Sequence, residues 1–208
     1  MVSGGVDSAV LIAEMLKNYS RVYPVYMQCG LRWETAELYW LRQYLTAVHT
    51  NALQPLTILQ LPVQDIYGEH WSLSGQSIPD SASEDAAVYL PGRNILLAGK
   101  AAVFCQQHHI PAIALATLAG NPFPDATKKF WADYANILTC ALGTSIKILT
   151  PFATLSKIDV LQCGKHLPLH LTFSCLDPLE TTPCGHCNKC EEKRLAFDKA
   201  NISDDISK

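Results

Sequence analysis

The chain has 208 residues, of which 49% are hydrophobic and 17% are charged, and its formal net charge is -3. This length and apolar content allow a sizeable core, as one domain or as one domain with a small appendage, and exclude a disordered or fibrous protein. The small negative charge gives no overall field that would attract nucleic acid or an anionic membrane. No apolar run reaches the roughly 18 residues that span a bilayer, and no signal-peptide pattern follows Met1, so we expect a cytoplasmic protein.

Apolar runs with strand character alternate with segments of helical periodicity along the chain. The helices that we predict span residues 7–18, 34–48, 94–108, 125–141 and 154–164, and the strands span residues 21–28, 56–61, 111–117 and 146–149. Helices inserted between short strands predict an α/β fold with a doubly wound, mainly parallel sheet. The stretch from about residue 65 to residue 92 is rich in Ser, Asp and Pro, which is typical of an irregular active-site loop.

The first motif is a glycine turn that runs into an apolar helix, Ser3-Gly4-Gly5-Val6-Asp7-Ser8. Glycines let the backbone approach an anion, and the start of the helix presents unpaired N–H groups, so the turn predicts a phosphate site. Ser3 and Ser8 can donate hydroxyl hydrogen bonds to phosphate, and Asp7 is a candidate ligand for the Mg²⁺ of a nucleoside triphosphate. The alternative is an ordinary turn with Asp or Ser as a helix cap. The motif is not a Walker A loop, because no Gly-Lys-Ser/Thr follows.

Four of the eight cysteines cluster near the C-terminus, at Cys175, Cys184, Cys187 and Cys190. Two successive Cys-x₂-Cys spacings let thiolates face one tetrahedral ion, and the preceding loop can return the first cysteine as a fourth ligand. Four soft thiolates in a closed geometry favour a structural Zn²⁺. The alternative is redox or sulfur-transfer chemistry at one Cys-x₂-Cys pair.

The two motifs together resemble those of one family. The glycine turn resembles the SGGxDS signature of the PP-loop ATP pyrophosphatases, which hold the pyrophosphate of ATP while a substrate oxygen attacks the α-phosphate. With the four cysteines, the chain resembles the 7-cyano-7-deazaguanine synthase (QueC-type) family over nearly its whole length. Three shorter stretches add to the resemblance, at residues 90–94 (LPGRN), 150–159 (TPFATLSKID) and 190–197 (CEEKRLAF).

The resemblance implies a fold, cofactors and binding residues. The fold is adenine nucleotide alpha hydrolase-like, with a PP-loop nucleotide-binding α/β domain in residues 1–165 and a C-terminal zinc-binding lobe in residues 166–208 packed on it. The cofactors are a structural Zn²⁺ and ATP with Mg²⁺. Asp7 and Ser8 are the expected catalytic residues, and ATP is expected to bind at Ser3, Gly4, Gly5, Val6, Asp7 and Ser8.

Four further residues are expected to line the substrate and nucleotide pocket: Arg93, Asn94, Asp125 and Lys157. Arg93 and Asn94 belong to a loop that lies close to this pocket in the family. Asp125 falls in the segment that lines the deazaguanine side, and Lys157 can reach phosphate as a point charge. A plain turn, a helix cap and an exposed helix face are the alternative interpretations of these positions.

The chain departs from the family pattern in two places. The family has a tyrosine-proline-aspartate-cysteine-arginine run where residues 123–127 read FPDAT, so Ala126 and Thr127 replace cysteine and arginine. Loss of the guanidinium removes a bidentate partner for a carboxylate, so the acceptor need not be 7-carboxy-7-deazaguanine. Only Met1 and Val2 precede the glycine turn, where the resemblance calls for a full first strand. We expect either a trimmed or misassigned start or another segment that completes the sheet.

The activity implied by the resemblance is a two-step, ATP-dependent ligation in queuosine biosynthesis. The carboxylate of 7-carboxy-7-deazaguanine, or of a related deazapurine acid in a close paralogue, is adenylated and displaced by ammonia, and the amide is then adenylated and eliminated as a nitrile. The implied partners are small molecules and a second copy in a homodimer, without nucleic acid or membrane. Two other classes stay open: an RNA sulfurtransferase with the same loop, which would want a basic surface and a reactive cysteine pair, and a non-enzymatic zinc-bearing interaction module.

Overall fold

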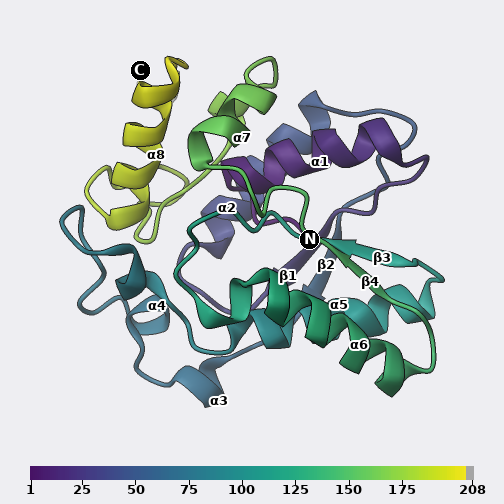
Figure 1. The fold of residues 1–208 in the computed structure, drawn as a ribbon. Helices are drawn as coiled ribbons and strands as arrows, with labels where there is room; N and C mark the ends of the chain where they lie inside the picture. The colour runs from purple at the N-terminus through teal and green to yellow at the C-terminus, as the bar shows by residue number, and fades with distance from the viewer. Residues whose placement is uncertain (205–208) are drawn as a thin grey trace.

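The computed structural model describes residues 1–204 and shows a mixed α/β protein with short parallel strands (Figure 1). Two pairs of strands form, β1 (Val25–Gln28) with β2 (Thr57–Gln60), and β3 (Ala112–Ala114) with β4 (Lys147–Leu149). The register places Val25 opposite Thr57 and Ala112 opposite Lys147. Each of the four predicted strands is therefore present, although each is shorter than predicted. In β1 the reason is Pro24, which has no N–H to continue the ladder back to the isolated bridge at Val22.

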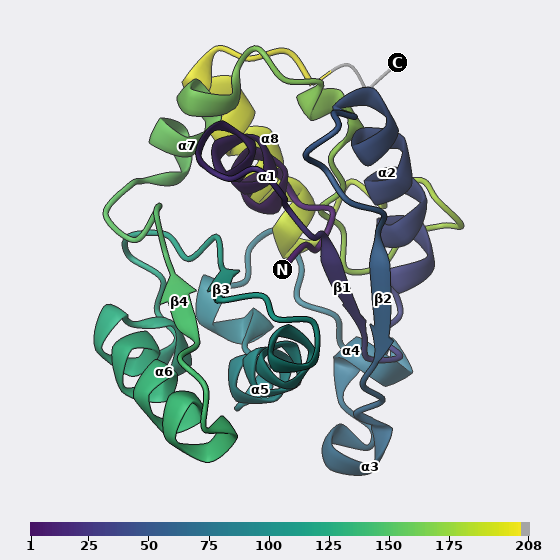
Figure 2. The same ribbon diagram turned by 90° about the vertical axis from the view of Figure 1, so that its right-hand side faces the viewer.

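Met1 and Val2 lie between the two pairs of strands. The N–H of Val2 donates to the carbonyl oxygen of Val25 at 2.9 Å, and the amino group of Met1 donates to that of Ala114 at 2.8 Å. Figure 2 shows the N-terminus between β1 and β3. These two residues connect the pairs where the resemblance calls for a full first strand.

The longer helices lie on both sides of the strands. Figures 1 and 2 show α1 (Val6–Asn18), α2 (Glu34–Ala47), α7 (Lys157–Gly164) and α8 (Asn188–Ala200) on one side. On the other side lie α5 (Arg93–Gln107) and α6 (Lys128–Leu142). The chain also forms single turns, α3 (Gln64–Tyr67), α4 (Trp71–Ser74), η1 (Asp85–Val88), η2 (Pro124–Ala126) and η3 (Leu169–Leu171).

Two of the predicted helices begin later than expected, and local capping explains both. The helix predicted from residue 125 begins at Lys128, because the Thr127 side chain accepts a hydrogen bond from the N–H of Phe130 and caps α6. The helix predicted from residue 154 begins at Lys157, because Ser156 and Asp159 form a capping box. Asp125 belongs to η2 and is not the cap of α6.

Helix α8 is not among the helices predicted from the sequence. Its residues are mostly polar or charged, so the apolar periodicity is weak, and its buried apolar side chains come late, at Ala196, Phe197 and Ala200. The loop predicted between residues 65 and 92 is irregular apart from α3, α4 and η1. No helix within residues 1–204 is both long enough and apolar enough to cross a membrane.

The packing of α1, α7 and α8 positions the site. Val10 of α1, Val160 and Leu161 of α7 and Phe197 of α8 are buried in one apolar cluster. Because these helices pack together, their N-terminal ends come close to one another and to the glycine turn.

Candidate active site and metal centre

Steric contacts explain the glycines in the turn before α1. Gly4 has a φ of 77°, in the left-handed region, and an added Cβ would lie 3.0 Å from the carbonyl oxygen of Glu37. Gly5 is the N-cap of α1, and as a glycine it has no side chain to accept hydrogen bonds from the first N–H groups of the helix. The turn therefore presents a free helix N-terminus, which is suited to an anion.

The two serines of the turn hydrogen-bond to each other and to the turn itself. Ser8 is buried, and its hydroxyl donates to the carbonyl oxygen of Gly5 at 2.9 Å and accepts from the N–H of Ser3 at 3.2 Å. The Ser3 hydroxyl lies 3.4 Å from that of Ser8 and is exposed. Ser8 therefore braces the turn, whereas Ser3 remains accessible to a ligand.

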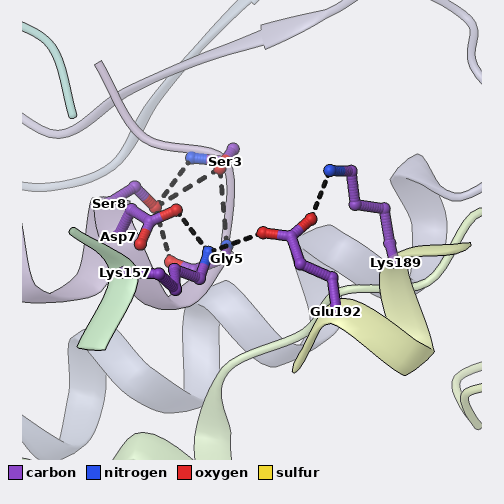
Figure 3. A network of polar contacts seen from close by, with 7 residues as sticks. All are labelled: Ser3, Gly5, Asp7, Ser8, Lys157, Lys189 and Glu192. Atoms are coloured by element: carbon purple, nitrogen blue, oxygen red, sulfur yellow. Dashed lines mark hydrogen bonds and ion pairs between the residues drawn. The ribbon is translucent and has the colours of Figure 1, made fainter. Parts of the chain in front are cut away.

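A row of alternating acids and cations lies beside the turn (Figure 3). Lys157, the first residue of α7, donates to Oδ2 of Asp7 at 2.6 Å. Its Nζ also lies 3.3 Å from Oε1 of Glu192 on α8, and Glu192 pairs in turn with Lys189. The structure thus places Lys157 next to Asp7 and not on an exposed helix face.

The neighbouring charges favour the ionised forms of Lys157 and Glu192. Burial acts to lower the pKa of Lys157, but the charges of Asp7 and Glu192 outweigh burial and the pKa is raised. Burial acts to raise the pKa of Glu192, but Lys157 and Lys189 outweigh it and the pKa is lowered. The second oxygen of Asp7, Oδ1, is buried and has no hydrogen-bond partner among the described residues. This oxygen is available to a cation.

The three remaining predicted pocket residues divide into a structural pair and an unpaired cation. The N–H of Asn94 donates to Oδ2 of Asp125 at 3.2 Å, and its Nδ2 donates to the Asp125 carbonyl oxygen at 3.1 Å. Asp125 is 5% exposed, so this pair fastens η2 to the start of α5. Arg93 forms no ion pair within residues 1–204, and its buried Nε has no partner there.

A cavity of 260 Å³, the aromatic cavity, opens on one side of the turn. Its aromatic side chains are Trp33, Trp71, Phe123 and Phe173. The rings of Trp33 and Trp71 stack with their centroids 5.8 Å apart and their planes 25° apart. Lysines on α7 and α8 line the same cavity, which therefore combines flat apolar surfaces with positive charge.

A second cavity of 240 Å³, the strand-end cavity, includes residues at the carboxyl ends of β1 and β3, among them Met27, Leu115 and Thr117. Four residues line both cavities: Ser3, Asp7, Glu37 and Arg93. The accessible face of the glycine turn and the unpaired arginine therefore lie on a border that the two cavities share.

Two glutamates at the start of α2 belong to this region and are not predicted from the sequence. Glu34 is 3% exposed and accepts the N–H groups of Cys29 at 2.6 Å and Gly30 at 2.9 Å, which fixes the turn after β1. Glu37 accepts the hydroxyl of Tyr26 on Oε2 at 2.6 Å. Their position in the sequence is the signal that could have identified them, because acids in the first turn of a helix that follows a parallel strand face the carboxyl edge of the sheet.

The four clustered cysteines converge on one point. The Sγ atoms of Cys175, Cys184, Cys187 and Cys190 all lie within 4.8 Å of one another, with 3.9 Å between those of Cys184 and Cys190. Four thiolates around a tetrahedral zinc at about 2.3 Å lie about 3.8 Å apart, so the spacing fits. The N–H groups of Leu176 and Cys184 donate to the sulfurs of Cys187 and Cys175 at 3.3 Å, which stabilises thiolates. The cluster can hold a metal ion such as zinc.

The cysteine cluster is linked to the segments whose residues line the aromatic cavity. Cys187 is the N-cap of α8 and bridges to Asp80 in the irregular loop. Cys175 follows Phe173, whose N–H donates to the carbonyl oxygen of Gly4 at 2.9 Å. The cysteine cluster therefore connects the glycine turn, the irregular loop and the start of α8.

Comparison with known proteins identifies the family that this chain matches. The family described as queuosine biosynthesis protein QueC matches residues 1–201. Three relatives named 7-cyano-7-deazaguanine synthase are similar along nearly their whole length. The protein of Leptospira interrogans is 27% identical, over 98% of this chain and 87% of its own length. Those of Methanothermobacter thermautotrophicus and Methanosphaerula palustris are 28% and 29% identical, over 98% and 99% of this chain and 95% and 96% of their own lengths.

Proposed function

This chain belongs to the QueC family of queuosine biosynthesis proteins, and we propose that it uses ATP to convert 7-carboxy-7-deazaguanine and ammonia into 7-cyano-7-deazaguanine, or that it acts on a closely related deazapurine acid. One observation carries this proposal. Ser3, Asp7 and Arg93 line both cavities, so a nucleotide in one cavity can present its α-phosphate to an acceptor in the other. Such a border is what adenylation needs, because the attacking oxygen and the phosphorus must be held close and in line.

We assign the nucleotide to the strand-end cavity and the glycine turn. In open parallel sheets, ligands bind at the carboxyl ends of the strands, next to a helix N-terminus that accepts phosphate. With Met1 and Val2 between β1 and β3, the order across the protein is β2, β1, residues 1–2, β3, β4. This order supports our proposal of a doubly wound, PP-loop type sheet.

The residues present fit a Mg²⁺ ion that accompanies ATP. The buried Oδ1 of Asp7 has no partner within residues 1–204, while Oδ2 is fixed by Lys157, so one hard oxygen ligand is available beside the phosphate site. A bound Mg²⁺ would neutralise the charge that develops on the departing pyrophosphate. Asp7 would bind the ion, Ser8 keeps the turn in shape, and the N–H groups of the turn would donate hydrogen bonds to phosphate oxygens.

We assign the acceptor to the aromatic cavity. The flat faces of Trp33 and Trp71 suit a planar deazapurine, and Arg93 is a cation that forms no ion pair within residues 1–204 and whose buried Nε has no hydrogen-bond partner there. Thr127, where the family has arginine, caps α6 instead. We therefore propose that Arg93 takes the role of carboxylate partner, which retains 7-carboxy-7-deazaguanine as the first substrate to test.

The sulfurtransferase alternative is less well supported. All four clustered cysteines converge on one closed site, and we propose that zinc there has a structural role. No cysteine pair within the described residues is then left near the two cavities for sulfur transfer. The homodimer, the absence of a nucleic-acid partner and the cytoplasmic location stay predictions.

The decisive experiment incubates the protein with ATP, Mg²⁺, ammonium and 7-carboxy-7-deazaguanine and follows nitrile and AMP by mass spectrometry. We expect both products from the wild type and neither from Asp7→Ala. The control variant is Glu14→Gln, which removes an acid of the same helix that pairs with Lys17 away from the turn, and it should form wild-type amounts of both products. AMP formed only with other deazapurine acids would retain adenylation and reject this substrate. A folded, zinc-loaded protein that forms no AMP with any such acid would reject the proposal.

A further inference from the structure

Glu37 and Asp7 are the acids that line both cavities, and of the two only Asp7 forms an ion pair within residues 1–204. Glu37 lies in the first turns of α2, lines both cavities, and borders the phosphate turn, because an added Cβ on Gly4 would lie 3.1 Å from its Cγ. Tyr26 fixes its Oε2, whereas Oε1 has no hydrogen-bond partner among the described residues. The carboxyl group is therefore held in one orientation with one oxygen free.

The other acids that line the cavities are neutralised by cations. Asp7 pairs with Lys157, and Glu192 pairs with both Lys157 and Lys189. Glu37 forms no ion pair within residues 1–204. An unpaired carboxyl group at the border between nucleotide and acceptor is suited to exchange a proton with the reacting group.

The proposed reaction requires such an exchange more than once. In the first stage, the nitrogen of ammonia forms a C–N bond to the acyl carbon, the C–O bond to AMP breaks with its electron pair on the AMP oxygen, and one N–H proton must leave. In the second stage, the amide oxygen forms a bond to the α-phosphorus, pyrophosphate departs, and a second N–H proton leaves. The C–O bond to AMP then breaks while the nitrogen gives up its last proton to form the nitrile.

We propose that Glu37 is the catalytic base that accepts these N–H protons on Oε1, a role that rests on the proposed function. Adenylation of the carboxylate itself releases no proton, so this first step does not need Glu37. Tyr26 is a positioning residue, because it acts on the reaction only through its hydrogen bond to Glu37.

The electrostatic surroundings agree with this role. Burial raises the pKa of Glu37 to about 8, although the hydrogen bond from Tyr26 on β1 and the charge of Arg93 on α5 act to lower it, and Glu34 on α2 acts to raise it. Burial and the nearby glutamates raise the pKa of Tyr26 well above its usual value, so Tyr26 keeps its proton and donates. A base with a pKa near the working pH is effective, because it is partly deprotonated and still takes a proton readily.

The test separates adenylation from ammonia transfer in Glu37→Gln. The amide that this substitution introduces is not charged, but its oxygen can still accept the Tyr26 hydrogen bond. We expect ATP–pyrophosphate exchange driven by 7-carboxy-7-deazaguanine, without ammonia, to stay within about 3-fold of the wild type, and ammonia-dependent nitrile formation to fall by about 100-fold or more. At saturating ammonia, kcat of the wild type should rise with pH through a pKa near 8, and this rise should be absent in the variant.

Tyr26→Phe provides a second variant in which the carboxyl group remains. Loss of the donor removes stabilisation of the carboxylate, so we expect activity to be retained and the rise of kcat to move to higher pH. Glu14→Gln, on the exposed side of α1, should leave both the rates and the pH profile unchanged.

Two outcomes would overturn the role of Glu37. Nitrile formation by Glu37→Gln at the wild-type rate would show that another group takes the protons. An equal loss of pyrophosphate exchange and nitrile formation would show that Glu37 only shapes the phosphate turn. Absence of exchange and nitrile in the wild type would instead reject the proposed function, so the two failures are distinguishable.

Discussion

Lys157 lies 2.6 Å from Asp7 although 150 residues separate them in the chain. The contact exists because α1 and α7 pack side by side and begin at the same end of the protein. It uses one oxygen of Asp7, and the other has no hydrogen-bond partner within residues 1–204. The two oxygens of one carboxylate therefore have different surroundings, one beside a cation and one without a partner among the described residues.

We expect Asp7→Asn to retain the fold and lose adenylation. The Asn oxygen can still accept from Lys157, but the side chain no longer offers a charged oxygen to a metal ion. Acid-dependent release of pyrophosphate should fall by about 100-fold to 1,000-fold, while the melting temperature changes little. A time course of pyrophosphate release and a thermal melt would measure the two quantities. Pyrophosphate release near the wild-type rate would exclude Asp7 from the catalytic site.

Lys157→Gln should remove a contribution to the free energy of unfolding that depends on pH. Asp7 and Glu192 lose their shared cation, so the unfolding free energy at pH 7 should fall by on the order of 2 kcal/mol for this partly exposed group. Because folding lowers the pKa of Glu192, its contribution is present above its unfolded value of about 4.3 and is lost as the pH falls through the lower folded value. Because folding raises the pKa of Lys157, its own contribution is lost only in strong base, as the pH rises above about 10.4 and through the folded value.

Urea unfolding of the wild type and Lys157→Gln between pH 3 and pH 7 would test this expectation. The difference between the two proteins should shrink in acid. A difference of the same size at every pH would mean that Lys157 stabilises the protein through packing and not through its charge.

Gly4→Ala should be more damaging than an alanine at another left-handed glycine. Gly4 and Gly143 have φ values of 77° and 62°, but only at Gly4 does a new Cβ meet backbone, at 3.0 Å from Glu37. We expect Gly143→Ala to lose about 1 kcal/mol from strain alone, and Gly4→Ala to lose about 2–3 kcal/mol together with pyrophosphate release. Equal losses of stability in urea unfolding, with activity retained in both, would show that the turn tolerates the contact.

Cys187→Ser should remove bound zinc and lower the stability of the C-terminal region. Cys187 is 1% exposed and occupies the N-cap position of α8, so loss of its thiolate opens a buried site. We expect less than one zinc per chain by elemental analysis, and a melting temperature lower by roughly 10 °C or more. The exposed Cys140 is the matched control, and Cys140→Ser should retain zinc and stability. Full zinc content in Cys187→Ser would exclude this residue as a ligand.

Much of the secondary structure is predictable because its signals are local. The glycine turn starts α1, the apolar periodicity places α2 and α5 to within a residue, and the four strands fall inside their predicted ranges. The errors have local causes as well. Thr127 and Ser156 cap their helices later than periodicity alone indicates, and the charged sequence of α8 conceals its few buried positions. The division into two units at residue 165 stays a prediction.

The phosphate turn and the cysteine cluster are predictable from the amino-acid sequence alone, because each motif places its functional groups within a few residues, where backbone geometry and ligand spacing constrain them. Three other features arise only when the chain folds: Lys157 meets Asp7, Asn94 and Asp125 brace each other, and Glu37 lies at the border of both cavities. These relationships join helices far apart in the chain. Their formation depends on how the apolar faces of α1, α2, α5, α7 and α8 pack, and no local pattern in the sequence specifies that packing.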